Sequence, residues 1–235
     1  MSTYVIIPHY NNWALTHNRL HEIYKHCKNS ISEVVIVDDF STDELTSGGL
    51  RWWAEFGVRY DFKVRALQTE ENVGFLRASN FGIFDTVSRG SPDDIIILLS
   101  NDVEIRTDFV RQVASILSQP KKMVGGILLS GDTGWNKFGD TIFPYLEGWL
   151  LALTAEGWKE CEWGFDERFS PCIFEDVDLS TYMLTLGYEL VPLNNPGLHH
   201  LTGQTIKYTP ERDELTKINK EKFRLKWIGE NSEEI

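Results

Sequence analysis

Four short apolar runs in the first half of the chain constrain the fold more than any other feature of the sequence. The runs cover residues 4–8, 33–38, 63–67 and 94–100. They recur about every 30 residues, which leaves room for one helix between successive strands. The second and fourth runs are apolar at most positions, as expected of strands that are covered on both faces. We therefore predict an α/β chain, with helices over 12–27, 50–56 and 74–88 between the strands.

The second half of the chain is less regular. Its pattern predicts strands over 124–129, 147–154 and 188–193, and a loop over the Gly- and Asp-rich residues 131–140. A helix is expected to start near Glu175 and to end at Gly187, and a charged helix covers 210–227. The tail 229–235 has too few apolar residues to pack and is expected to be flexible. No long linker divides the chain, so we expect one domain.

The composition excludes several classes of protein. The chain has 235 residues, of which 42% are hydrophobic and 25% charged, as in an ordinary globular domain. Its net charge of −12 provides no overall attraction to nucleic acid or anionic lipid. Three cysteines without CxxC spacing favour a reducing compartment. Because the sequence shows neither a long apolar run nor a signal peptide, we expect a cytoplasmic protein, free or at the inner face of the membrane.

Polar side chains follow every predicted strand of the first half. They are His9 and Tyr10, Asp38 and Asp39, Asn72 and Gly74, and Ser100, Asn101 and Asp102. Each is also an ordinary turn residue, but the carboxyl ends of parallel strands meet at one edge, where α/β sheets bind ligands. The glycine-rich phosphate loops of the common NAD and ATP sites are absent from the sequence. A phosphate-bearing ligand at this acidic edge would therefore need a divalent cation.

These residues resemble the GT-A glycosyltransferases of family 2. The matching strings are VIIPHYNN near the N-terminus, VVIVDDFSTD at 34–43, ENVGFLRASNFGI at 71–83, LLSNDVEI at 98–105, GFDERF at 164–169, FEDVDLS at 174–180 and HHLTGQT at 199–205. The GFDERF and FEDVDLS pair resembles the rhamnosyltransferase-type branch. The resemblance implies a GT-A fold, with a Rossmann-like nucleotide-sugar-binding half (1–105) and an acceptor half (106–228) around one mixed, mostly parallel sheet.

The resemblance also implies a donor site. Its expected donor-binding residues are Pro8, Tyr10, Asp38, Asp39, Asn72, Gly74, Arg77 and Asn101. The resemblance places Pro8, Tyr10 and Asp39 beside the nucleoside, with Asp38 as the other candidate for a contact with the base or ribose. It places Asn72 and Gly74 beside the donor, and Arg77 is the candidate for contacts with the phosphates. The donor is expected to be a UDP-, GDP- or dTDP-linked sugar.

The metal motif of the family, Asp-x-Asp, reads Ser100-Asn101-Asp102 in this chain. Asp102 is left as the strong ligand. The resemblance makes His200 the expected second ligand, with His199 as the competing choice. One carboxylate, one imidazole and diphosphate oxygens suit Mn²⁺ or Mg²⁺, and the imidazole favours Mn²⁺.

Two adjacent acidic residues, Glu175 and Asp176, open a predicted helix. Acids in a first turn also simply complement the helix dipole, but the same dipole keeps a carboxylate ionised, as a general base must be. By the resemblance, Asp176 is the catalytic base, and Glu175 and Asp178 shape the acceptor site. Four tryptophans fall in this half of the chain. We expect Trp149 and Trp163 to contact the acceptor, and Trp135 and Trp158 to serve core or loop packing.

The expected activity is an inverting, metal-dependent transfer of one sugar to a hydroxyl of a glycan or lipid-linked glycan. No nucleic-acid partner is expected. A basic stretch in the last helix allows at most peripheral membrane association. Two alternatives stay open. One is a nucleotidyltransferase that makes activated sugars, which would carry a Gly- and Arg/Lys-rich loop where this chain has HYNNW. The other is a sugar-binding protein that has lost catalysis, as the missing first acid of Asp-x-Asp suggests.

Overall fold

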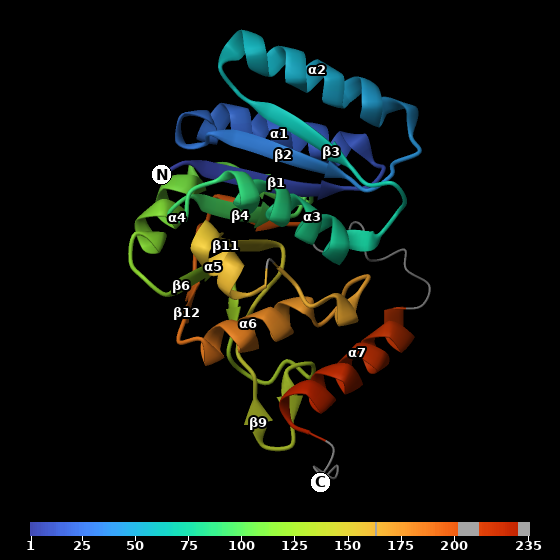
Figure 1. Cartoon of the computed structure of the whole chain (residues 1–235), viewed down its shortest axis with the longest axis vertical. Coiled ribbons are helices and arrows are strands. Elements are labelled where there is room, and N and C mark those ends of the chain that lie inside the picture. Colours follow the sequence, from blue (N-terminus) through green and yellow to red (C-terminus); the bar gives the residue numbers. More distant parts are fainter. Residues whose placement is uncertain (163, 202–211, 230–235) are drawn as a thin grey trace.

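The fold is seen in a computed structural model that describes residues 1–162, 164–201 and 212–229. Seven strands form the central sheet (Figure 1). They are β1 (Thr3–His9), β2 (Glu33–Asp38), β3 (Val64–Gln68), β4 (Ile95–Leu99), β6 (Lys122–Gly125), β11 (Leu150–Thr154) and β12 (Glu189–Pro192). Their order is β12-β6-β11-β4-β1-β2-β3, and β11 is antiparallel to both its neighbours. The other pairs are parallel, which confirms the mixed, mostly parallel sheet.

Three short two-stranded sheets lie outside the central one. They are formed by β5 (Val103–Ile105) with β13 (Leu198–His200), β7 (Leu128–Leu129) with β10 (Tyr145–Leu146), and β8 (Lys137–Phe138) with β9 (Thr141–Ile142). In the last pair, β8 falls within the segment 131–140 that the sequence predicts as loop, and β9 follows directly after it. Strands this short have too little apolar alternation to be recognised from the sequence.

Helices cover both faces of the central sheet. They are α1 (Trp13–Cys27), α2 (Glu44–Tyr60), α3 (Gly74–Arg89), α4 (Phe109–Leu117), α5 (Ala155–Glu160), α6 (Glu175–Thr185) and α7 (Arg212–Trp227). One core contains apolar side chains of α1, α2 and α4, and the other those of α3, α5, α6 and α7. Along β1, Val5 and Ile7 belong to the first core and Ile6 to the second, as strand alternation requires. The predicted α/β architecture is therefore confirmed.

The bounds of two elements differ from the sequence prediction, and a glycine lies at each point of difference. Helix α2 starts at Glu44, well before the predicted residue 50, because the Asp43 side chain accepts hydrogen bonds from the amides of Leu45 and Thr46. Gly48 and Gly49 obscure this start in the sequence. Gly49 is needed for packing, since a Cβ on it would lie 2.1 Å from the Trp13 ring, whereas a Cβ on Gly48 would have nothing within 4 Å. The predicted strand 124–129 breaks after Gly125. A Cβ on the next residue, Gly126, would overlap the Trp149 ring at 1.9 Å.

The C-terminal part of the described chain packs below the sheet. Figure 1 shows α6 and α7 side by side, with the hairpin of β8 and β9 next to α7. The ring of Phe223 in α7 is fully buried against Phe138, Phe143 and Phe174. Residues 230–235, which the sequence predicts to be a flexible tail, lie outside the described residues. Among the described residues, no helix has both the length and the apolar character that crossing a membrane requires.

Candidate functional site

A buried polar network joins the ends of β1 and β4. The Nδ1 and Nε2 atoms of His9 lie 2.8 Å and 2.9 Å from the hydroxyls of Thr16 and Thr46. Asn101 donates from Nδ2 to the Thr16 hydroxyl at 3.1 Å. Burial lowers the pKa of His9, although Asp38 and Asp43 oppose the shift, so this histidine stays neutral. The side chain of Asn101, predicted to bind the donor, is 7% exposed and faces this network.

The two acids after β2 organise the loops around them. Asp38 accepts from the Ser41 amide at 3.0 Å. Both oxygens of Asp39 are engaged, Oδ1 by the Thr69 hydroxyl and the Val73 amide and Oδ2 by the Gly74 amide at 2.8 Å. Asp38 and Asp39 are 4% and 3% exposed. Both therefore fix the backbone that carries the other candidate donor residues, and direct donor contacts by them stay a prediction.

Gly74 is the one donor candidate whose residue type the backbone dictates. Its φ of +85° lies in the left-handed region, where side chains with a Cβ are rare. A Cβ at this position would also lie 2.7 Å from the Cβ of Pro171. This glycine therefore lets α3 start directly against the segment that precedes α6.

The remaining donor candidates lie around the same edge with different exposure. Tyr10 is 42% exposed, Asn72 is exposed, and Pro8 is buried within β1. Arg77, predicted to contact phosphates, instead pairs its Nε with Oε2 of Glu167 at 3.2 Å. Both partners are about half exposed, so water screens this ion pair and the contact is weak.

Asp102 and His200 meet because β5 pairs with β13. In this antiparallel register His200 lies opposite Val103, the residue after Asp102. The Nε2 of His200 is 3.3 Å from Oδ1 of Asp102, which also accepts from the Ser100 hydroxyl at 2.6 Å. His199 is exposed and lies opposite Glu104. The geometry therefore favours His200 over His199 as the partner of Asp102.

A buried ion pair on α1 holds the turn that carries Asp102. Arg19 is 3% exposed and donates to the carbonyl oxygen of Val103 and, at 2.5 Å, to Glu22. Glu22 in turn accepts from the amide of Ile105 at 2.5 Å. This support was not recognised in the sequence, because nothing local to α1 indicates that its charged residues reach β5.

The Asp102 and His200 atoms fit a shared divalent cation. Octahedral ligands about 2.1 Å from Mg²⁺ lie roughly 3 Å apart, close to the separation observed here. Within the described ranges, no cluster of three or more His, Cys, Asp or Glu side chains is arranged to hold a metal. Two protein ligands would leave the other positions to a ligand that brings its own oxygens, such as a diphosphate.

Trp149 packs against this pair. Its ring is stacked on that of His200, with 5.5 Å between centroids and 22° between planes. It donates from Nε1 to Glu147 at 2.9 Å and is 8% exposed. Its carbonyl oxygen accepts from the amide of Ser100 at 2.8 Å. The indole thus supports the imidazole, and little of its surface is left for the predicted acceptor contact.

Asp176 lies at the start of α6, next to the same strand end. Its Oδ2 accepts from the Gly148 amide at 3.1 Å and its Oδ1 from the Val177 amide at 2.8 Å. Burial raises the pKa of Asp176 to about 6, and Glu147 adds to the rise. Because Gly148 adjoins Trp149, this carboxylate and the Asp102–His200 pair are attached to consecutive residues.

Glu175, the other member of the acidic pair, is 7% exposed. Burial and the neighbouring charge of Asp176 raise its pKa to about 8. Its Oε2 has no hydrogen-bond partner within the described part of the chain. Glu175 therefore keeps its proton to higher pH than an exposed glutamate does, because a second charge beside Asp176 is unfavourable.

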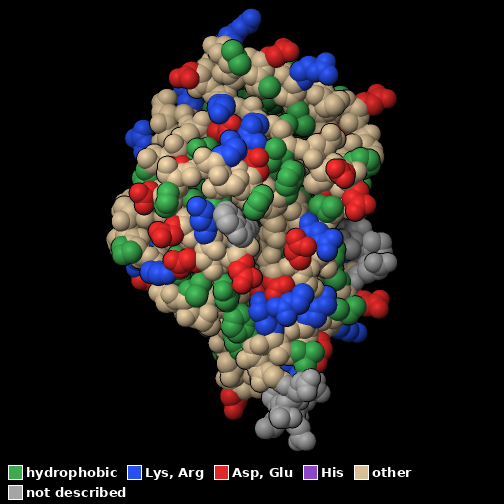
Figure 2. Space-filling view, viewed as in Figure 1, with side chains coloured by type: hydrophobic (Ala, Val, Ile, Leu, Met, Phe, Trp, Pro, Cys, Tyr) green, Lys and Arg blue, Asp and Glu red, His purple; other side chains and the backbone are tan. Residues whose placement is uncertain are grey.

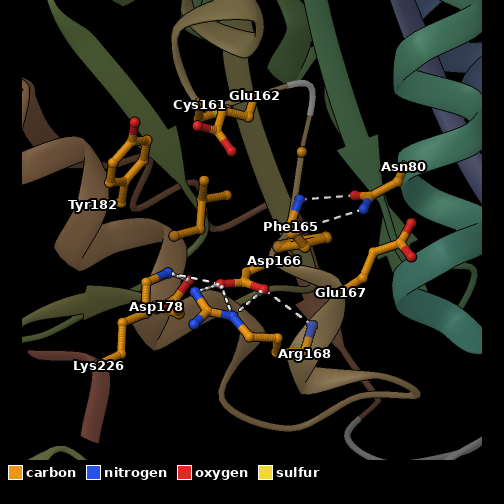
Figure 3. A pocket seen from close by; sticks show the side chains of 12 residues that line it. Asn80, Cys161, Glu162, Phe165, Asp166, Glu167, Arg168, Asp178, Tyr182 and Lys226 are labelled. Carbon is orange, nitrogen blue, oxygen red and sulfur yellow. Dashed lines mark hydrogen bonds and ion pairs between the residues drawn. The ribbon is translucent and has the colours of Figure 1, made fainter. Parts of the chain in front are cut away.

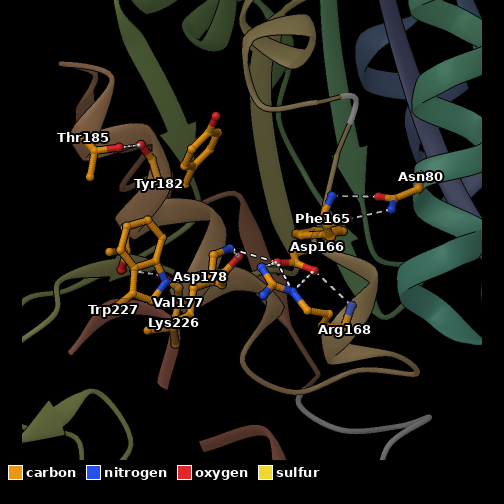
Figure 4. Close-up of polar contacts among 11 residues, drawn as sticks. Asn80, Phe165, Asp166, Arg168, Val177, Asp178, Tyr182, Thr185, Lys226 and Trp227 are labelled. Atoms are coloured by element: carbon orange, nitrogen blue, oxygen red, sulfur yellow. Dashed lines mark hydrogen bonds and ion pairs between the residues drawn. The ribbon is translucent and has the colours of Figure 1, made fainter. Parts of the chain in front are cut away.

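Asp178, predicted to shape the acceptor site, binds two residues of α7 in the structure. Its side chain is 2% exposed and accepts from Lys226 Nζ at 2.8 Å and from Trp227 Nε1 at 2.7 Å (Figure 4). Lys226 also binds Asp166, which in turn binds Arg168. These contacts hold α7 against α6, and a contribution of Asp178 to the shape of the acceptor site stays a prediction.

A cavity of about 530 Å³ lies between α3, α6 and the segment 161–168 (Figure 3). Its charged lining contains Glu162, Asp166, Glu167, Asp178, Arg168 and Lys226. On the face that Figure 2 shows, basic side chains likewise lie beside acidic ones, so neither sign dominates. Of the predicted site residues, Asp178 alone lines this cavity. The cavity is therefore separate from the edge that carries Asp102 and Asp176.

The remaining tryptophans differ from one another in exposure. Trp158 is fully buried and donates to the carbonyl oxygen of Ile96, which confirms the predicted packing role. Trp135 is 38% exposed, and its ring lies 6.5 Å from that of Phe174, directly before the acidic pair. Trp135 thus packs in a loop, as predicted, but its indole is partly exposed at the surface. Trp163 lies outside the described residues.

Comparisons with known proteins show the family and the fold of the chain. A sequence model of the family described as Glycosyl transferase family 2 matches residues 4–173. The match ends just before the acidic pair at the start of α6. No curated protein sequence matches the chain.

Several solved structures share the fold. A mannosyltransferase from Pyrobaculum calidifontis, in complex with GDP-Man and Mn²⁺, has a TM-score of 0.61 and 21% identity, covering 81% of this chain and 54% of its own. GalNAc-T7 with UDP, GalNAc and Mn²⁺ has a TM-score of 0.65 and 16% identity, covering 82% and 43%. S. aureus TarS with UDP-GlcNAc has a TM-score of 0.53 and 18% identity, covering 78% and 53%. The chain thus spans about half the length of these proteins.

Proposed function

Because the chain belongs to glycosyl transferase family 2, we propose that it transfers one sugar from a nucleotide-sugar donor to a hydroxyl of a glycan or lipid-linked glycan. The donor is a UDP-, GDP- or dTDP-linked sugar. The rhamnosyltransferase-type branch stays a prediction. One observation carries the proposal: Gly148 binds the Asp176 carboxylate while the next residue, Trp149, supports the Asp102–His200 pair. Two neighbouring residues thus hold the candidate base and the candidate metal ligands, and a displacement at one carbon requires such groups to be held in a fixed geometry.

In the proposed reaction, Asp176 accepts the proton of the acceptor hydroxyl. The oxygen of that hydroxyl attacks the anomeric carbon of the donor sugar, and the bond from that carbon to the nucleoside diphosphate breaks. A single displacement inverts the anomeric configuration and needs no covalent sugar intermediate. The amides of Gly148 and Val177 hold the carboxylate in place, at 3.1 Å and 2.8 Å.

The leaving group carries two phosphates, and the residues near it are acidic. We propose that Asp102 and His200 hold Mn²⁺ or Mg²⁺ together with diphosphate oxygens. A bound cation would neutralise the charge that develops on the leaving diphosphate. Ser100 contributes by donating its hydroxyl hydrogen to Oδ1 of Asp102 at 2.6 Å, which fixes the orientation of the carboxylate.

Among the tryptophans of this half that the structure describes, Trp135 has the exposure that a contact with an acceptor sugar needs. It lies next to Phe174 and is 38% exposed, whereas Trp149 is 8% exposed. The fully buried Asn136 holds the loop around Trp135, because it donates to the carbonyl oxygens of Gly131 and Phe143 at 3.0 Å. A fixed, exposed aromatic face suits an apolar face of a sugar ring.

The proposal is tested by incubating the protein with UDP-, GDP- and dTDP-linked sugars, with Mn²⁺ and with EDTA. Release of a nucleoside diphosphate from one donor class, dependent on the cation and increased by a glycan acceptor, is the expected result. Pyrophosphate production from a sugar phosphate and a nucleoside triphosphate would instead support a nucleotidyltransferase. Donor binding without turnover in every acceptor mixture would support a sugar-binding protein that has lost catalysis. Either of these results contradicts the proposal.

A further inference from the structure

Helix α7 follows the part of the chain that matches the family, yet it contacts the segment in front of the acidic pair. Its Asn219 is fully buried. The Nδ2 of Asn219 donates to the carbonyl oxygens of Phe169, Cys172 and Ile173 at 3.0, 2.9 and 2.9 Å. An amide has two hydrogens, so at least one of them is shared between two acceptors. The Asn219 side chain therefore binds three carbonyl groups of the five-residue segment 169–173.

The orientation of this amide is fixed by a neighbouring lysine. The Oδ1 of Asn219 accepts from Lys222 Nζ at 2.9 Å, and the same ammonium donates to the carbonyl oxygen of Arg168 at 2.5 Å. The NH₂ group must then face the segment 169–173. A flipped amide would place its oxygen against three carbonyl oxygens and its hydrogens against an ammonium.

The segment that Asn219 holds has an unfavourable backbone. Ile173 and Phe174 both have a φ of 76°, in the left-handed region, and neither is glycine. Such conformations persist where surrounding contacts determine them, and they concentrate at functional sites. Phe174 is the residue from which α6 starts, and its ring packs 5.7 Å from that of Phe223 in α7. Helix α7 thus contacts both strained residues.

The placement of Asp176 depends on this backbone. The conformation at Phe174 sets the direction in which α6 begins, and Asp176 is in the first turn of that helix. Further along the same helix, Asp178 is tied to α7 through Lys226 and Trp227. Helix α7 consequently holds α6 on both sides of Asp176, while Gly148 binds the carboxylate itself.

We propose that Asn219 is a positioning residue for Asp176: by binding the carbonyl groups of residues 169, 172 and 173 it sets the strained turn that aims this carboxylate. The role rests on the proposed function in that it assumes Asp176 to be the base. The proposal makes the C-terminal helix α7, which lies outside the family match, necessary for the position of the base. Among the contacts described, Asn219 of α7 is the donor to all three carbonyl groups.

The test is Asn219→Asp, which keeps the size of the side chain and removes both amide hydrogens. We expect kcat for transfer to fall by about 10- to 100-fold, the usual effect of displacing a reacting group by about 1 Å. The affinity for the nucleoside diphosphate should change less than about twofold, because most of the candidate donor residues follow β1, β2 and β4 and do not contact the segment 169–173. Asn219→Ser keeps one hydroxyl donor and should lose less kcat than Asn219→Asp.

Asn80→Asp is the matched control. Asn80 donates from Nδ2 to the carbonyl oxygen of Phe165 at 2.8 Å and accepts from the Phe165 amide at 2.7 Å, so this change also weakens an amide contact to a loop. It should lower thermal stability without the selective loss of kcat. An Asn219→Asp protein that is folded and keeps wild-type kcat would overturn the proposal. So would a parallel loss of kcat and nucleotide affinity, which indicates a general loss of structure.

Hydrogen exchange separates failure of this role from failure of the proposed function. In Asn219→Asp, the amides of residues 169–178 should exchange at least about tenfold faster than in the wild type, while those of β1 and β4 stay protected. This measurement needs no activity, so it remains decisive even if no nucleotide sugar is turned over. Unchanged exchange over 169–178 would overturn the proposal. If Asn219→Asp does not fold, Asn219→Ser provides the same comparison.

Discussion

The amide of Gly148 donates to Oδ2 of Asp176 at 3.1 Å, and this bond connects helix α6 to the end of the central sheet. The two residues also pack closely, because a Cβ on Gly148 would lie 3.3 Å from the Cβ of Asp176. Trp149, the next residue, stacks on His200, which lies 3.3 Å from Asp102. The position of the candidate base relative to the candidate metal ligands is therefore set by two consecutive residues.

Replacing Asp176 by Asn should abolish the base without disturbing the contact to Gly148, because an amide oxygen still accepts the hydrogen bond. We expect the transfer rate to fall by about 10²- to 10⁴-fold, the usual contribution of general base catalysis. Nucleotide affinity, measured by titration calorimetry, should stay within about twofold of the wild type. Asp140→Asn, at an exposed position, is the control. Transfer by the Asp176→Asn variant at the wild-type rate would show that another group is the base.

The pH dependence of transfer should reflect the environment of Asp176. Burial raises the pKa of this carboxyl to about 6, with Glu147 adding to the rise. Because the base must be ionised, kcat should fall as the pH drops through about 6. Glu147→Gln removes a negative charge while its amide oxygen can still accept from Trp149 Nε1. That change lowers the pKa of Asp176, so the acidic limb of the kcat profile should move to lower pH. A limb that stays in place or moves to higher pH contradicts this assignment.

Removing the candidate metal ligands should remove the effect of the cation on nucleotide affinity. In the wild type, Mn²⁺ should increase the affinity for UDP or GDP and raise the melting temperature further than either ligand does alone. Asp102→Ala should remove this gain, and His200→Ala should reduce it. His199→Ala is the matched control, because this neighbouring side chain lies opposite Glu104. Calorimetric titrations with and without Mn²⁺ measure the effect, and a full Mn²⁺ gain in Asp102→Ala would refute the assignment.

Gly74→Ala should destabilise the protein. The new side chain would have to adopt a φ of +85° and its Cβ would lie 2.7 Å from that of Pro171. We expect a loss of about 1–3 kcal/mol in the free energy of unfolding, measured by urea denaturation. Gly48→Ala provides the opposite control. Gly48 lies in helix α2 with nothing within 4 Å of its added Cβ, so this change should stabilise the protein by about 0.5–1 kcal/mol. Equal effects of the two substitutions would contradict this reasoning.

Trp135→Ala should weaken binding of the acceptor and leave binding of the donor unchanged. An aromatic stacking contact contributes about 0.5–1.5 kcal/mol, so the acceptor KM should rise roughly 2- to 12-fold. The donor KM should not change. Trp52→Ala is the control, because Trp52 is 46% exposed on α2, which packs on the opposite face of the sheet. An unchanged acceptor KM, or equal effects of the two variants, would remove Trp135 from the acceptor site.

Much of the fold could be predicted from local patterns. The four strands of the first half lie within one or two residues of the predicted runs, and α3 begins at the predicted Gly74. Apolar periodicity and strand length are properties of neighbouring residues, so they can be read along the chain. The start of α2 could not be found in this way. Gly48 and Gly49 disfavour a helix locally, whereas the Asp43 cap and the close approach of Trp13 support one.

By itself the sequence determined which residue types stand at the strand ends and that Glu175 and Asp176 begin a helix. Tertiary structure decided the rest. The register of β5 with β13 brings His200, rather than His199, to Asp102. The packing of α7 withdraws Asp178 into an ion pair, and a polar loop leaves Trp135 exposed. These outcomes depend on contacts between residues far apart in the chain. Strand register and helix packing determine which of these contacts form, and the residues next to each site in the sequence do not indicate them.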